Sequence, residues 1–224
     1  MSAFNSGKLI CVLLALALSA PAAADALNWK FDVLLDDKEI GFHTFSVAND
    51  GSTAVMETEA KFDVKFLFIT AFRYRHQNTE IWSDGCLSSI DATTIRNGDL
   101  LEVKGQQGDD SFAVRGQNGA ATLGDCVQTF AYWNPAILHS DRLLNSQTGE
   151  YEDVTVTFED RDEVVVGDRP VDALRYRLSA KAGDITLWYS SDTSRWLALE
   201  APAKGGRTIR YEPAEVPTAG NRVG

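Results

Sequence analysis

Apolar and polar residues alternate in most segments of this chain, and this two-residue period constrains the fold more than any other feature. In the segment WKFDVLL, the residues Trp29, Phe31, Val33 and Leu35 have the same parity. Successive side chains of a β-strand point to opposite faces of a sheet, so these residues lie on one face and their polar neighbours on the other. We therefore expect strands with one buried face and one face in contact with water.

Turn signals separate these segments at short intervals. Asn-Gly or Asp-Gly pairs stand in SDG at 83–85, RNG at 96–98 and QNG at 117–119. Such pairs supply the positive φ angles of tight hairpins, which predicts an antiparallel meander. A sheet of about ten to twelve strands is expected to curl or fold over, because long free edges invite aggregation. The predicted fold class is all-β and mainly antiparallel: a single curled sheet, barrel or half-barrel, with a sandwich as the alternative.

One segment breaks the alternation. Asn134 is a good N-cap and Pro135 suits the first helical position, so the sequence predicts one short helix over about 135–144. Ile137, Leu138 and Leu144 form its apolar stripe. A helix this short is unstable alone, so we expect it to pack on the sheet, either as a cap or as a lid over a ligand pocket.

The chain begins with features of an export signal. Residues 1–24 hold one charge, at Lys8, an apolar run over 9–18 and small residues before Asp25. This pattern predicts a signal peptide cut after Ala24. We expect a single β-rich domain over 25–212 and a flexible tail over 213–224, which is rich in Pro and Gly. No later apolar stretch is long enough to span a bilayer, so an integral membrane protein is not expected.

Charge and cysteines narrow the possible partners. Without Lys8 the chain has 20 basic and 32 acidic residues, a net charge of −12. This charge opposes binding to nucleic acid, which requires clustered Lys and Arg. Cys86 and Cys126 are the two cysteines after the leader. In an oxidising compartment such a pair predicts a disulfide, which closes a loop of about 40 residues.

The segment FRYRHQNTEIW places polar and aromatic residues of the same parity on one strand. Its aromatics indicate that this face is the inner one, which directs His76 and Glu80 into the interior. They stand about 13 Å apart along the strand and cannot touch each other directly, so each needs a partner from a neighbouring strand, with His43 a candidate neighbour. Three interpretations remain: a hydrogen-bonded structural inlay, a polar floor in an aromatic pocket, and an acid/base pair.

The chemical alternatives are few. The sequence contains no nucleophile elbow, zinc-protease motif or phosphate-binding glycine loop, and its histidines lack metal-ligand spacing. We expect no metal and no cofactor, and we assign no catalytic residue beyond the weak candidates His76 and Glu80. The candidate ligand-binding residues are His43, Tyr74, His76, Glu80, Trp82, Tyr132 and Trp133.

Several longer segments resemble one known family. The segments 62–98, 130–150, 174–200 and 205–212, with their spaced aromatics and Asn-Gly turns, resemble the exported bacterial proteins of domain-of-unknown-function family 6134 (DUF6134). The resemblance covers nearly the whole chain after the leader. It implies a single-domain envelope protein of Gram-negative bacteria with no established activity, and it supplies no catalytic residue.

Two functions of different classes follow from these patterns. The first, which the sequence favours, is a periplasmic protein that binds an apolar or amphipathic molecule, such as a lipid, in a β-cavity and helps to maintain the envelope. The second is a hydrolase-type enzyme that uses His76 and Glu80 in that cavity. A structural or partner-binding β-domain with a filled core is the alternative to both, and the oligomeric state stays open.

Overall fold

A computed structural model describes residues 26–66 and 69–217 of the chain. The predicted signal peptide, residues 1–24, lies outside the described residues.

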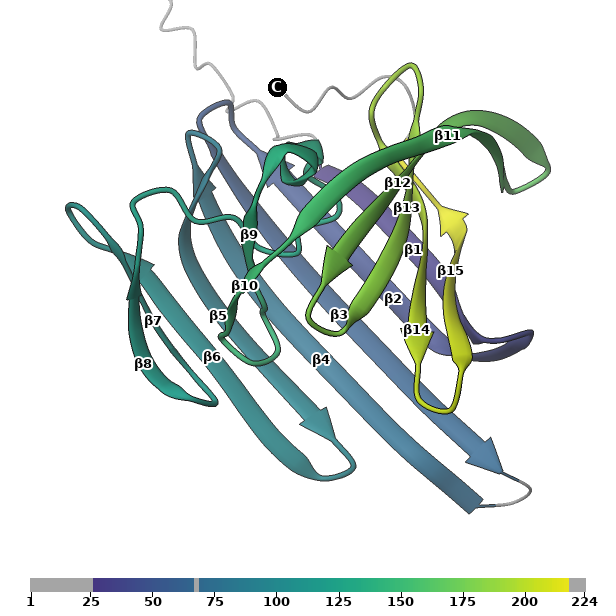
Figure 1. The fold of residues 1–224 in the computed structure, drawn as a ribbon, viewed down its shortest axis with the longest axis horizontal. Helices are drawn as coiled ribbons and strands as arrows, with labels where there is room; N and C mark the ends of the chain where they lie inside the picture. The colour runs from purple at the N-terminus through teal and green to yellow at the C-terminus, as the bar shows by residue number, and fades with distance from the viewer. Residues whose placement is uncertain (1–25, 67–68, 218–224) are drawn as a thin grey trace, which may run out of the picture.

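One antiparallel sheet of 13 strands dominates the fold, and a two-stranded sheet, β9 with β10, accompanies it (Figure 1). The strands of the first half are β1 (Ala26–Leu35), β2 (Lys38–Asn49), β3 (Thr53–Phe66), β4 (Ile69–Ser83), β5 (Cys86–Arg96), β6 (Asp99–Gln107), β7 (Phe112–Gly116) and β8 (Gly119–Leu123). The remaining strands are β9 (Arg142–Leu144), β10 (Tyr151–Asp153), β11 (Thr155–Val166), β12 (Arg169–Ala180), β13 (Gly183–Ser190), β14 (Trp196–Ala203) and β15 (Arg207–Glu215).

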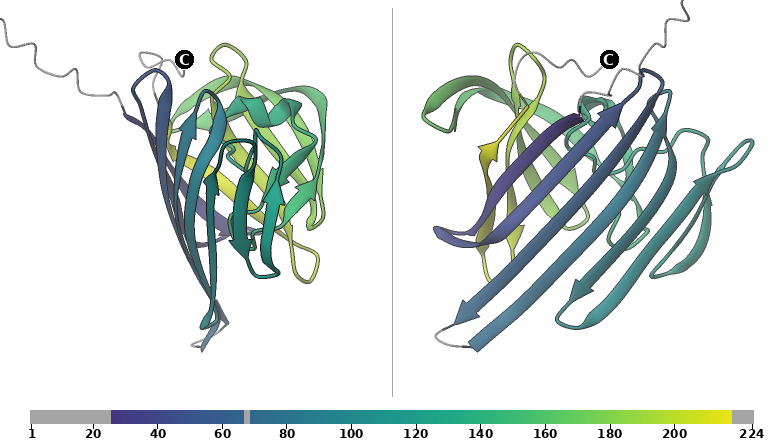
Figure 2. Two further views of the ribbon diagram at one scale, coloured as in Figure 1. Left: turned by 90° about the vertical axis from the view of Figure 1, so that its left-hand side faces the viewer. Right: turned by 180° about the vertical axis from the view of Figure 1, so that it is seen from behind.

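The large sheet consists of two meanders joined at the first and last strands. Strands β1 to β8 and β11 to β15 each pair with their sequence neighbours, and β1 pairs with β15 to join the two. Tight turns drive this topology, because Asp36, Asp84 and Asn97 adopt the positive φ angles that short hairpin loops require. The order runs from β11 to β8 without closing, so the predicted curled meander is confirmed as an open one. Figure 2 shows the two arms of the sheet wrapping toward each other.

The predicted alternation determines which side chains fill the inside of the curl. In β1, Leu27, Trp29, Phe31, Val33 and Leu35 are buried, and the polar residues between them are more exposed. Antiparallel pairing aligns inward residues of neighbouring strands in rows across the sheet. One such row runs through Phe31, His43, Ala60, His76 and Thr94.

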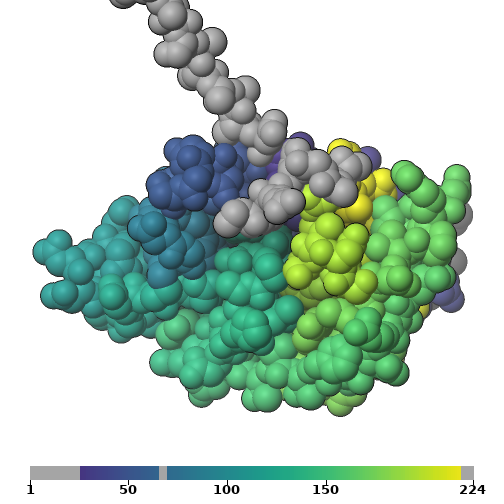
Figure 3. Space-filling model, turned by 90° about the horizontal axis from the view of Figure 1, so that it is seen from above, coloured from purple at the N-terminus to yellow at the C-terminus, as the bar shows by residue number. Residues whose placement is uncertain are grey.

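The segment 126–154, which we call the plug, fills one half of the interior. Its apolar side chains join those of the sheet in the larger of two core clusters. The fully buried plug residues are Val127, Ile137, Leu143 and Leu144. Figure 3, a view from above, shows this green part of the chain between the blue hairpins and the yellow-green hairpin.

The predicted helix over 135–144 is wrong in length and type. The plug contains a five-residue 3-10 helix, η1 (Pro135–His139), and Arg142–Leu144 instead form strand β9. Asn134 does act as the N-cap, because its side chain accepts a hydrogen bond from the Ala136 amide. Beyond Ser140, the backbone bonds to the returning chain: the Val154 amide donates to the Asp141 carbonyl, and β9 pairs with β10. Tertiary pairing therefore outweighs the local helical preference.

Contacts at several points hold the plug against the first meander. The predicted disulfide is confirmed: Cys86 and Cys126 are bonded, with their Cα atoms 5.0 Å apart. Next to it, the Leu87 amide donates to the Val127 carbonyl at 3.0 Å. On the far side, Gly116 lies so close to the plug that a Cβ there would be 2.3 Å from the Thr148 carbonyl oxygen.

The last strand continues beyond the expected end of the domain at residue 212. Strand β15 reaches Glu215, where it pairs with Lys30 of β1. Of the expected tail, 213–224, residues 218–224 lie outside the described part of the chain.

Candidate functional site

The inner face of β4 carries a ladder of polar and aromatic side chains, as the parity of its residues predicts. Tyr74, His76, Asn78, Glu80 and Trp82 are all buried, and the residues between them are exposed or half-buried. The ladder runs from the plug, at Trp82, toward the smaller core cluster, which contains no plug residue, at Tyr74. The two ends of the ladder have different surroundings.

At the plug end, Glu80 is a fully buried carboxyl group that joins the sheet to the plug. Its oxygens accept hydrogen bonds from the Asn78 amide at 2.9 Å, the Trp82 indole at 3.1 Å and the Thr129 hydroxyl at 3.1 Å. Burial raises the pKa of Glu80 to about 7, and the three hydrogen bonds oppose that shift. The expected partner from a neighbouring strand is absent here, because these partners belong to β4 itself and to the plug.

His76 has the cross-strand partner that the sequence led us to expect. Its Nδ1 lies 2.8 Å from the Thr94 hydroxyl on β5. Burial lowers the pKa of His76 to about 4, so the imidazole is neutral at pH 7. Among the described residues, its Nε2 has no hydrogen-bond partner.

His43 lies in the same row as His76, with one strand between them. The Thr58 hydroxyl donates to the Thr44 carbonyl at 2.7 Å, so it must accept from Nε2–H of His43, which is 2.7 Å away. Nδ1 of His43 therefore accepts from the Tyr211 hydroxyl at 3.0 Å. Burial and the nearby His76 hold the pKa of His43 well below its usual value, in agreement with this neutral tautomer. The two imidazoles interact through space but share no hydrogen bond.

Three tyrosine hydroxyls converge near the histidines. Tyr74 comes from β4, Tyr211 from β15 and Tyr132 from the plug. Burial raises the pKa of all three. Electrostatic repulsion from Tyr74 raises the pKa of Tyr132 further, and repulsion from Tyr74 and Tyr132 raises the pKa of Tyr211 further. Tyr74 stacks on Phe62 with ring centroids 5.0 Å apart, which fixes its orientation.

We define the interior cluster as the neutral polar side chains that meet here: His43, Thr58, Tyr74, His76, Thr94, Tyr132 and Tyr211. It lies where the larger core, which contains Phe45, meets the smaller core, which contains Phe62. Two charged groups flank it. Arg96 affects the pKa of Tyr74, and Glu152 affects the pKa of Tyr132.

Of the seven candidate ligand-binding residues, the structure brings four together in the interior cluster: His43, Tyr74, His76 and Tyr132. Glu80, Trp82 and Trp133 pack instead at the plug end, where the two indole rings meet edge to face at 5.7 Å. Tyr132 and Trp133 are sequence neighbours, but Tyr132 belongs to the interior cluster and Trp133 packs at the plug end. His76 and Glu80 share no hydrogen bond or ion pair, since Asn78 stands between them and bonds to Glu80 alone.

Sequence reasoning missed Tyr211, Thr58 and Thr94. Thr58 and Thr94 have the inward parity of their strands, a signal that was present but shared with many other residues. Tyr211 gave a weaker signal, because β15 comes last in the chain and pairs with β1, the first strand. No local pattern specifies that pairing.

Several polar atoms of the interior cluster lack a partner in the protein. Among the described residues, the hydroxyls of Tyr74 and Tyr132 make no hydrogen bond, like Nε2 of His76. None of these atoms is among the fully enclosed polar atoms without a partner, a group that does include Asn78 Oδ1 and Trp133 Nε1. Polar atoms in such surroundings normally bond to water or to a ligand.

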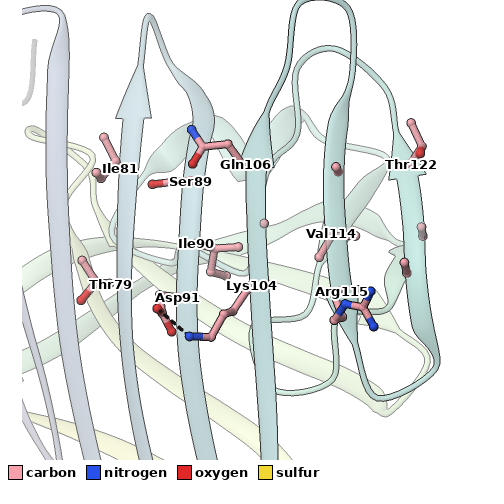
Figure 4. A pocket seen from close by; sticks show the side chains of 14 residues that line it. Thr79, Ile81, Ser89, Ile90, Asp91, Lys104, Gln106, Val114, Arg115 and Thr122 are labelled. Carbon is pink, nitrogen blue, oxygen red and sulfur yellow. Dashed lines mark hydrogen bonds and ion pairs between the residues drawn. The ribbon is translucent and has the colours of Figure 1, made fainter.

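One depression in the surface lies elsewhere. It measures about 780 Å³ and spans the outer face of β4 to β8, where Asp91 and Lys104 form an ion pair (Figure 4). Its lining includes Thr79 and Ile81, which alternate with the inward residues of β4. It is shallow and contains no residue of the interior cluster.

Two further classes of feature are absent from residues 26–66 and 69–217. That part of the chain holds no group of three or more His, Cys, Asp or Glu side chains arranged to bind a metal ion. It also holds no helix of the length and hydropathy needed to cross a membrane.

Comparison with known proteins identifies the family and the fold. The model of DUF6134, a domain of unknown function, matches residues 31–214, so the chain belongs to this family and the resemblance seen in the sequence is confirmed. No curated protein matches the sequence. Among solved structures, a β-barrel-like protein of family DUF1849 from Brucella abortus is similar, with a TM-score of 0.62 and 10% identity over 88% of this chain and 99% of that chain. At that identity the similarity establishes a shared fold alone.

Proposed function

We propose that this DUF6134 protein is an exported, periplasmic binding protein that holds an amphipathic molecule at the interior cluster without transforming it. Three polar atoms support this proposal above all: the hydroxyls of Tyr74 and Tyr132 and Nε2 of His76 have no protein partner within the described residues. A filled structural core normally satisfies most of its polar groups. At the other end of the ladder the Glu80 carboxyl accepts three hydrogen bonds, although Asn78 Oδ1 and Trp133 Nε1 lack a partner there. Unpartnered groups that come together from two elements, β4 and the plug, are typical of a binding surface.

An apolar wall adjoins these polar atoms. Phe62 and Tyr74 form a stacked pair, and Phe72, Val64 and Ile209 extend the smaller core as half-buried side chains. A bound molecule would place its polar group at the interior cluster and its apolar part along this wall. Tyr132 of the plug forms the inner end of the site. In this proposal the plug has the role of the lid, one of the two roles expected for the short helix from the sequence.

The geometry gives less support to an enzyme. An acid/base pair requires two groups within reach of the same substrate proton, in contact or through one water. Glu80 directs its oxygens to three donors in the core, and His76 bonds to Thr94. We therefore assign Glu80 a structural role and His76 a binding role.

The experiment compares the co-purifying molecules of the wild type and one double variant. The protein is purified from the periplasm of its native host and examined by native mass spectrometry, with solvent extraction of lipids in parallel. We expect a bound small molecule in the wild type and a loss of most of it in the double variant Y74F/Y132F. These hydroxyls bond to no described residue, so their removal should leave the folded protein as stable as before.

A matched control separates binding from packing. The hydroxyl of Tyr189 donates to the Tyr132 carbonyl at 2.8 Å, so Y189F removes a structural hydrogen bond. Y189F should lower the stability and keep the bound molecule. Absence of any co-purifying molecule from the wild type, or its full retention in Y74F/Y132F, contradicts the proposed site.

A further inference from the structure

The hydrogen-bond directions within the interior cluster restrict the chemistry of the group that it binds. The chain of bonds from Tyr211 through His43 and Thr58 to the Thr44 carbonyl consumes the Tyr211 proton. The Tyr211 oxygen can therefore only accept a further hydrogen bond. A ligand group that meets this oxygen must be a donor.

The other tyrosines add the opposite requirement. The protons of Tyr74 and Tyr132 are uncommitted among the described residues, so both hydroxyls can donate. No two of the three tyrosine hydroxyls bond to each other. Their rings nevertheless share neighbours: Tyr74 and Tyr211 contact Phe62 with centroids 5.0 and 6.5 Å away, and Tyr132 and Tyr211 contact Trp196 at 5.3 and 6.2 Å. A single atom placed among them would accept from Tyr74 or Tyr132 and donate to Tyr211.

The charges at the edges disfavour an ionic group. Arg96 is in register with Tyr74 on the inner side of β5, and Glu152 lies near Tyr132. Arg96 attracts an anion that Glu152 repels, and Glu152 attracts a cation that Arg96 repels, so neither ion gains from both flanks. The interior cluster itself holds no charge that would neutralise an ion. Bringing a charge into such surroundings without a partner is costly.

We propose that the interior cluster selects an uncharged group that both donates and accepts a hydrogen bond, and that its ligand is an alcohol with a large apolar body. This inference rests on the binding function proposed above and adds the class of ligand. Carboxylates accept only and ammonium groups donate only, so each leaves part of the interior cluster unsatisfied.

The test uses three probes with the same tail and different head groups: 1-decanol, decanoate and decylammonium. Binding to the delipidated full-length mature protein is measured at pH 7 by calorimetry. The site is identified by imidazole NMR, since the chain has three histidines and His139 is exposed on η1 away from the interior cluster. We expect decanol to bind at least about tenfold more tightly than either ion and to shift the signals of His43 and His76 but not of His139.

Two variants sharpen the result. Y74F should weaken decanol binding by about fivefold, the effect of one neutral hydrogen bond. Y151F, a matched loss of a tyrosine hydroxyl outside the interior cluster, and R96Q should leave it unchanged. If decanoate or decylammonium binds as tightly as decanol with the same NMR shifts, the head-group inference is overturned and the binding site stands. If no probe shifts His43 or His76, the inference and the proposed site both fail.

Discussion

The hydroxyl of Thr129 donates a hydrogen bond to the carboxyl group of Glu80 at 3.1 Å, across a sequence separation of 49 residues. This contact joins the central strand of the first meander to the plug, inside the core. Together with the disulfide between Cys86 and Cys126, it determines where the plug lies and hence where Tyr132 meets the interior cluster.

Glu80 should make the stability of the protein depend on pH. Its pKa rises from 4.5 in the unfolded chain to about 7 in the folded protein, so the folded state binds the proton more tightly. The free energy of unfolding should therefore fall as pH rises from about 4.5 to about 7, by about 3 kcal/mol from this group alone. Urea unfolding of wild type and E80Q over this range should show the decline in wild type relative to E80Q. Parallel profiles would mean that Glu80 titrates normally.

His76 should remain neutral in mildly acidic solution. Burial lowers its pKa from 6.5 to about 4, so its contribution to the free energy of unfolding is present above about 6.5 and is lost as pH falls toward about 4. An imidazole NMR titration should show the neutral form of His76 at pH 5.5. A midpoint near 6.5 would place this side chain in ordinary contact with water.

The disulfide should stabilise the plug specifically. Replacing both Cys86 and Cys126 with alanine releases a loop of 40 residues, which costs up to about 4 kcal/mol in the chain-entropy model. Hydrogen exchange should rise first at Leu87 and in the plug, where the backbone pairs beside the bridge. Faster exchange spread evenly over all strands would show that the bridge stabilises the whole sheet instead.

The close approach of β7 to the plug should make the stability of the protein sensitive to any side chain at Gly116. In G116A, the new Cβ would lie 2.3 Å from the Thr148 oxygen and 2.7 Å from the Gly149 Cα, so one of the two segments must move. We expect a loss of about 1–3 kcal/mol in urea unfolding. Gly124 is the matched control, because nothing lies within 4 Å of a Cβ there, and G124A should change stability by less than about 0.5 kcal/mol. Equal effects of the two substitutions would contradict this packing.

The confirmed parts of the sequence-based prediction are those that depend on short-range patterns. Alternation placed Tyr74, His76 and Glu80 on the inner face of β4, and paired cysteines predicted the bridge. The helix over 135–144 was also predicted from a short-range pattern, and it was wrong. The N-cap and the apolar spacing favoured a helix locally. The backbone of Arg142–Leu144 instead pairs with β10, and these hydrogen bonds outweigh those of a further helical turn.

The sequence by itself determined the strands, their turns and the side of each strand that is buried, because each depends on residues that are neighbours in the chain. It also predicted the disulfide, because Cys86 and Cys126 are the two cysteines that follow the expected leader. Only the tertiary structure decided that β15 lies beside β1, that the sheet stays open between β8 and β11, and that Tyr211, Tyr132 and His43 meet. These relationships depend on the total twist of the sheet and on which strands that are distant in sequence become neighbours. Every strand contributes to the twist, so no single segment of the sequence encodes it.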